Sequence, residues 1–301
     1  MTAKAFVPGH VTCIFRIHDE HENPLWRGSR GAGFGVLAGT KTTVSIESSS
    51  STEINVNYND EPIDASVTET VVHRLLEEQE QNFKVTVHHQ SELPIGVGFG
   101  ASGAGALGTA ISLAHLLTPD SDPTTTAAHA HYAEVVNHTG LGDVIAQTYG
   151  GIEVRLHPGA PGIGKIVNIT PPHNLHVVLA GAPGLETKKV LTDPEHRSRI
   201  NQAGDELLFG LTSNPNLENL IDCSKRFAES IGLMTPRVES ALNDLRDAGL
   251  ENSSMVMLGD SVFTLCQENQ ISPATEILAN HWDDSQVMVT SISTKGGRLI
   301  E

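Results

Sequence analysis

The segment LPIGVGFGASGAGALGTA, residues 93–110, changes from a glycine-rich half to an apolar half and decides the fold of the chain. Before it, residues 83–88 alternate between apolar and polar side chains, which predicts a strand. Within and beyond it, Leu107, Ile111 and Ala114 recur at helical spacing. The sequence therefore predicts a strand that runs through a glycine-rich turn into the N-terminus of a helix.

This glycine-rich turn predicts a binding site for an anion. Glycines let backbone N–H groups approach a ligand closely, and the helix that follows presents its positive end. No lysine or arginine occurs between Lys84 and Arg155, so a polyphosphate bound here needs backbone amides together with a metal ion. Magnesium takes oxygen ligands, which Ser102 and a carboxylate from a neighbouring element can supply. The structural alternative is a tight corner in which Ser102 only caps the helix.

Two glycine patterns resemble other nucleotide-binding motifs but lack the context that those motifs need. Residues 98–103 fit G-x-G-x-x-G, yet Asp120 and Asp122 precede a helix, whereas a dinucleotide fold has its acidic residue after a second parallel strand. Residues 159–166 fit G-x-x-x-x-G-K, yet Ile166 replaces the hydroxyl residue of a P-loop and a β-branched run follows. We therefore interpret residues 159–166 as a turn that links two domains.

The remaining pattern favours an α+β protein of two domains. The first third of the chain is rich in strand-like segments, but residues 28–39 contain so many glycines that we expect a loop there. A helix is expected over residues 124–137. Turn-forming residues accumulate around position 165, which predicts one domain over residues 1–165 and a second α+β domain over residues 166–301.

Composition excludes several classes of partner. The chain of 301 residues carries 36 acidic and 19 basic side chains, and its net charge of −17 repels nucleic acid and anionic lipid surfaces. Its 3 cysteines form no Cys-x-x-Cys pair, which indicates free thiols in a reducing compartment. The N-terminal segment lacks the apolar block of a signal peptide, and no apolar run reaches membrane-spanning length. We therefore expect a cytoplasmic protein that binds neither nucleic acid nor membranes.

Three segments together resemble the motifs of the GHMP kinases, which phosphorylate small molecules. Residues 93–110 resemble the phosphate-binding motif of that family, P-x-x-x-G-L-G-S-S-A, while PGHVTCIF (residues 8–15) and MLGDSVFTL (residues 257–265) resemble its first and third motifs. The residues that fall on the phosphate-binding pattern are Pro94, Gly98, Gly100 and Ser102. The resemblance implies an N-terminal α/β domain similar to ribosomal proteins and a C-terminal ferredoxin-like α+β domain.

Within this family the combination is similar to the pantoate kinases of archaea, through GSRGAGFG (residues 28–35) and GLGDVIAQTYGG (residues 140–151) in addition. The similarity implies transfer of the γ-phosphoryl group of ATP to the 4-hydroxyl of (R)-pantoate, on the archaeal route to coenzyme A, with Mg²⁺ as cofactor. It also suggests a homodimer. Homoserine, shikimate or a mevalonate derivative stays open as the acceptor, as does a non-catalytic ligand-binding regulator with the same fold.

The resemblance assigns roles to residues around the turn. Ser102 and Glu134 are implied to hold Mg²⁺, and Asp143, seven residues before Gly150, takes the place of the catalytic aspartate of mevalonate kinases. Its carboxylate would accept the proton of the attacking hydroxyl, and Ser102 and Glu134 complete the implied catalytic set. The implied ATP-binding residues are Pro94, Gly96, Gly98, Gly100, Ala101, Ser102, Gly103 and Ala104.

Binding of pantoate needs a cation for its carboxylate, and a cation of fork geometry suits it best. Arg155, on an expected strand, is the first candidate, and Ser29 and Arg30 are further donors from residues 28–35. His131 lies three residues before Glu134 on one helical face, so it is expected to point into the same cleft. His10 stands where mevalonate kinase has a lysine, which leaves the partner of Asp143 open at this point.

Overall fold

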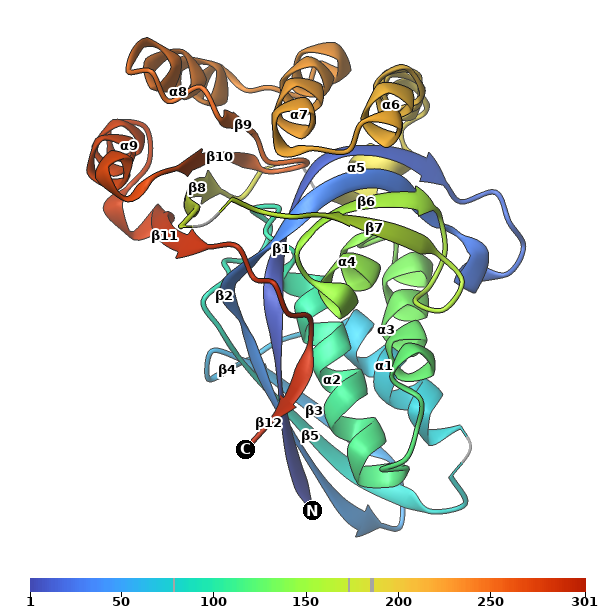
Figure 1. The fold of residues 1–301 in the computed structure, drawn as a ribbon. Coiled ribbons are helices and arrows are strands. Elements are labelled where there is room, and N and C mark those ends of the chain that lie inside the picture. Colours follow the sequence, from blue (N-terminus) through green and yellow to red (C-terminus); the bar gives the residue numbers. More distant parts are fainter. Residues whose placement is uncertain (78, 173, 185–186) are drawn as a thin grey trace.

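The computed structural model describes residues 1–77, 79–172, 174–184 and 187–301, and the strands of the N-terminal half form one large sheet (Figure 1). Its path runs β12-β1-β2-β5-β3-β4, and β2 also pairs with β6, which in turn pairs with β7. Strands β3 and β5 are parallel. The strands of this sheet are β1 (Thr2–His18), β2 (Gly28–Ser49), β3 (Glu53–Tyr58), β4 (Glu61–Pro62), β5 (Asn82–Ser91), β6 (Ile152–His157), β7 (Lys165–Ile169) and β12 (Arg298–Ile300).

Helices cover one face of this sheet (Figure 1). The central helix, α2, packs against β1 and β2 on one side and against α1, α3 and α4 elsewhere. These helices are α1 (Ser66–Leu76), α2 (Ala101–Leu117), α3 (Pro123–Asn137) and α4 (Asp143–Tyr149), and a short 3-10 helix, η1 (Pro24–Trp26), precedes β2. The predicted strand, glycine-rich turn and helix are thus confirmed as β5, the turn and α2, and the helix expected over residues 124–137 is confirmed as α3.

The C-terminal half forms a second sheet in the order β11-β8-β10-β9. Helices α7, α8 and α9 pack against this sheet, whereas α6 packs beside α7 and over β1 (Figure 1). Mixed strands and helices in both halves confirm the predicted α+β class. The elements of this half are β8 (His176–Ala182), α5 (Thr187–Thr192), α6 (Pro194–Ser213), α7 (Leu217–Ile231), α8 (Pro236–Asp247), β9 (Ser253–Met255), β10 (Asp260–Cys266), η2 (Glu268–Gln270), α9 (Ile271–Ala279), η3 (Asp284–Gln286) and β11 (Val287–Ser291).

The two halves share a core. The ring centroids of Phe34 on β2 and Phe263 on β10 lie 5.1 Å apart, and those of Phe15 on β1 and Phe227 on α7 lie 5.7 Å apart. Edge-to-face aromatic pairs of this kind stabilise packing beyond the area that they bury. The strand β12 also returns to the first sheet, where it pairs with β1. The halves are therefore joined both by packing and by strand pairing.

The prediction of a loop over residues 28–39 is wrong, because these residues belong to β2. Their glycines serve close packing within the sheet. A Cβ atom on Gly31 would lie 2.3 Å from the carbonyl oxygen of Ile14, and one on Gly33 would lie 2.3 Å from that of Val11. The glycines therefore let β1 and β2 approach each other, a tertiary requirement that composition alone reads as a loop.

No helix in the described part of the chain has the length and apolar character that a membrane crossing needs.

Candidate active site

The three motif segments converge on the glycine-rich turn. The backbone N–H of His10, in the first segment, donates to the carbonyl oxygen of Phe99 at 3.0 Å. The hydroxyl of Ser261, in the third segment, donates to the carbonyl oxygen of Val97 at 2.8 Å. The turn is therefore held from both sides by segments that lie far from it in the sequence.

A cavity of about 410 Å³ opens at this junction. The turn and the first residues of α2 form one wall, β1, β2 and β6 form the floor, and residues of the second half complete the rim. Among its lining residues are Thr12, Phe15, Ser29, Pro94, Gly96, Gly98, Gly100, Ala101, Ser102, Gly103, Glu134, Thr139, Asp143, Arg155, Thr187 and Met257. Ala104, the last of the predicted ATP-binding residues, is buried behind this wall and is absent from the described lining.

The turn has a backbone that only glycine adopts readily. Gly96, Gly98 and Gly100 have φ values of 81°, 84° and 73°, in the left-handed region where a Cβ atom is strained. Gly100 is also the N-cap of α2, and no side chain caps this helix end. The hydroxyl of Ser102 therefore does not cap the helix, and the first amides of α2 remain available to an anion at the cavity wall.

Ser102 and Glu134 form a close pair across α2 and α3. The hydroxyl of Ser102 donates to Oε1 of Glu134 at 2.5 Å, and Thr139 donates to the same oxygen at 2.8 Å. The other oxygen, Oε2, is buried without a partner among the described residues. Burial, with a smaller effect from the charge of Asp143, raises the pKa of Glu134 to about 7. A bound cation would offset the cost of ionising this buried carboxylate and would give its unpartnered oxygen a partner.

Asp143 begins α4 and faces the cavity, where its side chain is 25% exposed. Its Oδ1 lies 2.7 Å from Nδ1 of His10, and Nε2 of His10 lies 3.0 Å from Oε1 of Glu153. An imidazole can donate to two carboxylates only when both ring nitrogens carry protons, so His10 is an imidazolium in this arrangement. The residue that occupies the place of the mevalonate kinase lysine is therefore a cation as well.

The pKa shifts of this pair follow from its geometry. Burial alone would lower the pKa of His10, but the charge of Glu153 and the hydrogen bonds to both carboxylates raise it to about 9. Burial alone would raise the pKa of Asp143, but the hydrogen bond and charge of His10 outweigh burial and lower it. Asp143 is therefore ionised at neutral pH and able to accept a proton.

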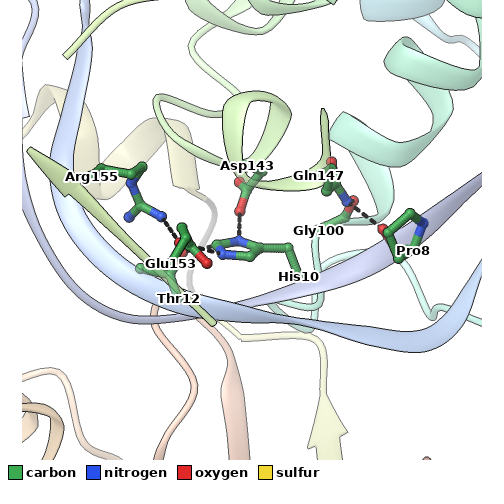
Figure 2. Close-up of polar contacts among 8 residues, drawn as sticks. All are labelled: Pro8, His10, Thr12, Gly100, Asp143, Gln147, Glu153 and Arg155. Atoms are coloured by element: carbon green, nitrogen blue, oxygen red, sulfur yellow. Dashed lines mark hydrogen bonds and ion pairs between the residues drawn. The ribbon is translucent and has the colours of Figure 1, made fainter. Parts of the chain in front are cut away.

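Arg155 lies at the other end of the same row of charges (Figure 2). Its Nη1 donates to Oε1 of Glu153, two residues earlier on β6. The side chain is only 1% exposed, and its Nε and Nη2 atoms have no partner among the described residues. A buried guanidinium with two free donors at a cavity wall suits the forked geometry of a carboxylate.

The other predicted substrate residues lie in different places. Ser29 lines the cavity, whereas Arg30 and His131 are absent from its described lining. Arg30 lies opposite Arg16 in the pairing of β2 with β1. His131 is buried, which lowers its pKa to about 4, and its Nε2 donates to the carbonyl oxygen of Arg27 at 2.9 Å. His131 thus fixes the segment before Ser29 and does not face the cavity itself.

Sequence reasoning missed two contributors to this site. Glu153 precedes Arg155 by two residues on a strand, so both side chains share a face, and this spacing could have indicated the ion pair. Gln147 on α4 was also missed, and its Nε2 donates to the carbonyl oxygens of Gly100 at 2.9 Å and Pro8 at 3.0 Å. Nothing in the local sequence around Gln147 signals this contact.

The described residues hold no group of three or more His, Cys, Asp or Glu side chains that could bind a metal ion by themselves. Mg²⁺ nevertheless fits here, because in nucleotide sites it takes one or two carboxylates and completes its shell with phosphate oxygens and water. The unpartnered Oε2 of Glu134 and the hydroxyl of Ser102 are ligands of the required oxygen type.

Comparisons with known proteins place this site in a family. The model of the GHMP kinases N terminal domain matches residues 66–151. A pantoate kinase from Thermococcus kodakarensis is 36% identical over 285 residues, which cover 93% of each protein. A pantoate kinase from Methanocaldococcus jannaschii is 32% identical over 275 residues, which cover 91% of this chain and 97% of that protein.

A solved structure described as a phosphotransferase related to the CoA biosynthesis pathway is similar throughout. It is 33% identical to this chain, has a TM-score of 0.88, and the match covers 100% of this chain and 99% of the other. Likeness in sequence and in fold therefore extends over nearly the entire polypeptide, the glycine-rich turn and both halves included. These findings confirm the resemblance stated from the motifs, and the chain belongs to the pantoate kinases, a branch of the GHMP kinase family.

Proposed function

We propose that the protein is an ATP-dependent kinase that transfers the γ-phosphoryl group to the 4-hydroxyl of (R)-pantoate, giving 4-phosphopantoate for coenzyme A biosynthesis. One observation carries the proposal: a single cavity brings together the uncapped end of α2, the pair Ser102–Glu134, the ionised Asp143 and the free donors of Arg155. The similarity to pantoate kinases over nearly the whole chain supports this choice of substrate.

The turn and α2 bind the triphosphate in this proposal. Backbone amides of residues 100–103, which line the cavity, donate to phosphate oxygens, and the helix end adds its positive potential. Ser102 and Glu134 would hold Mg²⁺, which when bound supplies positive charge to the phosphate oxygens. Pro94 and Gly96, at the rim of the cavity, contact the nucleotide.

Asp143 receives the proton of the attacking hydroxyl. His10 holds the carboxylate of Asp143 in place and keeps it ionised, so that one oxygen is free to align the alcohol for in-line attack. Phosphoryl transfer depends chiefly on position and charge stabilisation, so this orienting hydrogen bond matters as much as basicity.

Arg155 and Ser29 bind the substrate carboxylate. Two donors of Arg155 remain free for a bidentate contact, and the hydroxyl of Ser29 lines the same part of the cavity. His131 lies outside the cavity and supports Ser29 indirectly, because its hydrogen bond to the backbone at Arg27 holds the segment that precedes Ser29. This arrangement favours an acid with a hydroxyl a few bonds away.

The experiment is a substrate comparison. Purified protein is incubated with Mg-ATP and, in turn, with (R)-pantoate, homoserine, shikimate and mevalonate, and ADP release is measured. Phosphorus NMR then identifies the oxygen that is phosphorylated. We expect turnover with pantoate and a phosphate on its 4-oxygen. Turnover with another alcohol alone would reject the substrate, and ligand binding without ADP release would indicate a regulator.

We infer that the enzyme works in the cytoplasm, as its 3 buried free cysteines and the charge of the chain suggest. The homodimer that the family resemblance suggests is also part of this proposal. Light scattering of the purified protein tests it, with a mass of twice 32.1 kDa expected for the dimer.

A further inference from the structure

Glu153 lies between His10 and Arg155 and contacts both side chains. Its Oε1 accepts a hydrogen bond from Nε2 of His10 at 3.0 Å and another from Nη1 of Arg155. Its side chain is 1% exposed and does not belong to the described lining of the cavity. Glu153 therefore does not line the cavity, yet it contacts both His10, the partner of Asp143, and Arg155, the proposed partner of the substrate carboxylate.

The four side chains form a row of alternating charge, Asp143, His10, Glu153 and Arg155 (Figure 2). Buried charges are tolerated when each has an opposite neighbour and a hydrogen bond. Glu153 supplies this neighbour to two cations at once. Without it, His10 and Arg155 would be two buried cations close to each other, with Asp143 as their only acid partner in the row.

The floor beneath this row is shaped to hold it. A Cβ atom on Gly33 would lie 2.7 Å from Nε2 of His10, and one on Gly31 would lie 2.6 Å from Nη2 of Arg155. Both glycines belong to β2, which pairs with β6 next to Glu153. The sheet therefore leaves space for the two cations on either side of one carboxylate, which indicates an arrangement built around Glu153.

We propose that Glu153 is a positioning residue that couples the two arms of the site, holding His10 against Asp143 and Arg155 against the carboxylate of the substrate. This inference rests on the proposed function and extends it. Glu153 fixes the geometry of proton acceptance and of substrate binding together, so replacement of its carboxylate weakens both. Binding of the nucleotide, on the opposite wall, is left intact.

The test is steady-state kinetics of Glu153→Gln, with Glu153→Asp and Glu47→Gln beside it. Glu153→Gln keeps the size of the side chain and removes its charge. We expect kcat to fall at least about tenfold and KM for pantoate to rise at least about tenfold, since each charge-assisted hydrogen bond carries that much. KM for ATP stays within about twofold. Glu47 is an exposed carboxylate of β2, and its variant behaves as wild type.

The pH profile distinguishes positioning from a merely structural role. The charged groups that act on His10 are Asp143 from α4 and Glu153 from β6, while Asp143 itself interacts with Arg155 of β6 and with Glu134 of α3. Removal of the Glu153 charge lowers the pKa of His10, because that charge favours the protonated imidazole. The alkaline limb of the pH profile of kcat therefore moves to lower pH in Glu153→Gln. Glu153→Asp retains the charge and keeps the limb closer to its wild-type position.

Outcomes that overturn the proposal are distinct from a failure of the proposed substrate. A fall of kcat in proportion to the folded fraction, with KM for pantoate and the alkaline limb unchanged, would show that Glu153 only supports folding. Circular dichroism and urea unfolding of each variant give the folded fraction. If the wild type phosphorylates a different alcohol, the proposed substrate is wrong, and the same measurements with that alcohol still decide the role of Glu153.

Discussion

Nδ1 of His10 and Oδ1 of Asp143 lie 2.7 Å apart, although 133 residues separate them in the sequence. The contact joins the first motif segment to the start of α4. It gives the proposed proton acceptor, Asp143, a charged partner at the position where the family resemblance implies a lysine in mevalonate kinases. A histidine differs from a lysine in one respect that can be measured, because its charge can be lost at accessible pH.

The first prediction concerns this charge. The pKa of His10 is raised from 6.5 to about 9, so its stabilising effect is fully present below pH 6.5 and is lost as the pH rises through 9. Over that interval we expect the free energy of unfolding of the wild type to fall by at most about 3 kcal/mol more than that of His10→Gln. Urea unfolding at a series of pH values measures the difference. Parallel curves for the two proteins would contradict a charged His10.

The second prediction separates the proposed role of Asp143 as proton acceptor from the proposed role of Ser102 and Glu134 in holding Mg²⁺. Asp143→Asn should lower kcat by about 10²- to 10⁴-fold, because the proton acceptor is lost, and leave KM for Mg-ATP nearly unchanged. Ser102→Ala should instead raise the Mg²⁺ concentration needed for half-maximal activity, because a ligand next to Glu134 is lost. Initial rates over a matrix of ATP and Mg²⁺ concentrations measure both effects. Near-wild-type turnover in both variants would remove this assignment.

The third prediction concerns the substrate carboxylate. Arg155→Gln should raise KM for pantoate by about 10- to 100-fold, because a charge-assisted contact is lost, while KM for ATP changes little. Arg155→Lys should restore only part of the affinity, because an ammonium keeps the charge but not the fork. Arg226→Gln, at an exposed ion pair on α7, is the control and should match the wild type. Unchanged pantoate kinetics in Arg155→Gln would place the carboxylate elsewhere.

The fourth prediction tests the glycine floor of the site. A methyl group on Gly33 would lie 2.3 Å from the carbonyl oxygen of Val11, and the nearest atom to one on Gly35 would be 3.4 Å away. Gly33→Ala should therefore destabilise the protein by about 1–3 kcal/mol and displace His10, whereas Gly35→Ala should cost far less. Thermal unfolding and kcat of the two variants measure the loss of stability and the displacement of His10. Equal behaviour of the pair would show that the sheet relaxes around the extra carbon.

Local patterns in the sequence predicted the parts of the site that depend on local backbone. The alternation over residues 83–88 and the helical spacing that follows 93–110 are properties of neighbouring residues, and they predicted the strand, the turn and α2. Three motif segments in the right order indicated the family. Ser102, Glu134 and Asp143 were named from the family resemblance. Ser29 and Arg155 were named from the chemistry of a substrate carboxylate, and the structure brings all five residues to one cavity.

The features that the sequence did not predict depend on contacts between distant strands. Residues 28–39 read as a loop because nothing local shows that β1 approaches their glycines closely. The charge of His10 depends on Asp143 and Glu153, which no pattern near position 10 indicates. The orientation of His131 toward the backbone at Arg27 depends on how η1 passes over α3. Helical spacing gives the face of a helix but not its neighbour.

The pairing of β12 with β1 has a consequence for synthesis of the protein. Residues 298–300 lie against residues 4–6, so the chain must be synthesised as far as residue 300 before the outer edge of β1 is covered at residues 4–6. Until then, the N–H and C=O groups along that edge are open to pairing with other nascent chains, a known route to aggregation. Deletion of residues 298–300 is therefore expected to lower the yield of folded protein, because the edge of β1 at residues 4–6 then stays uncovered.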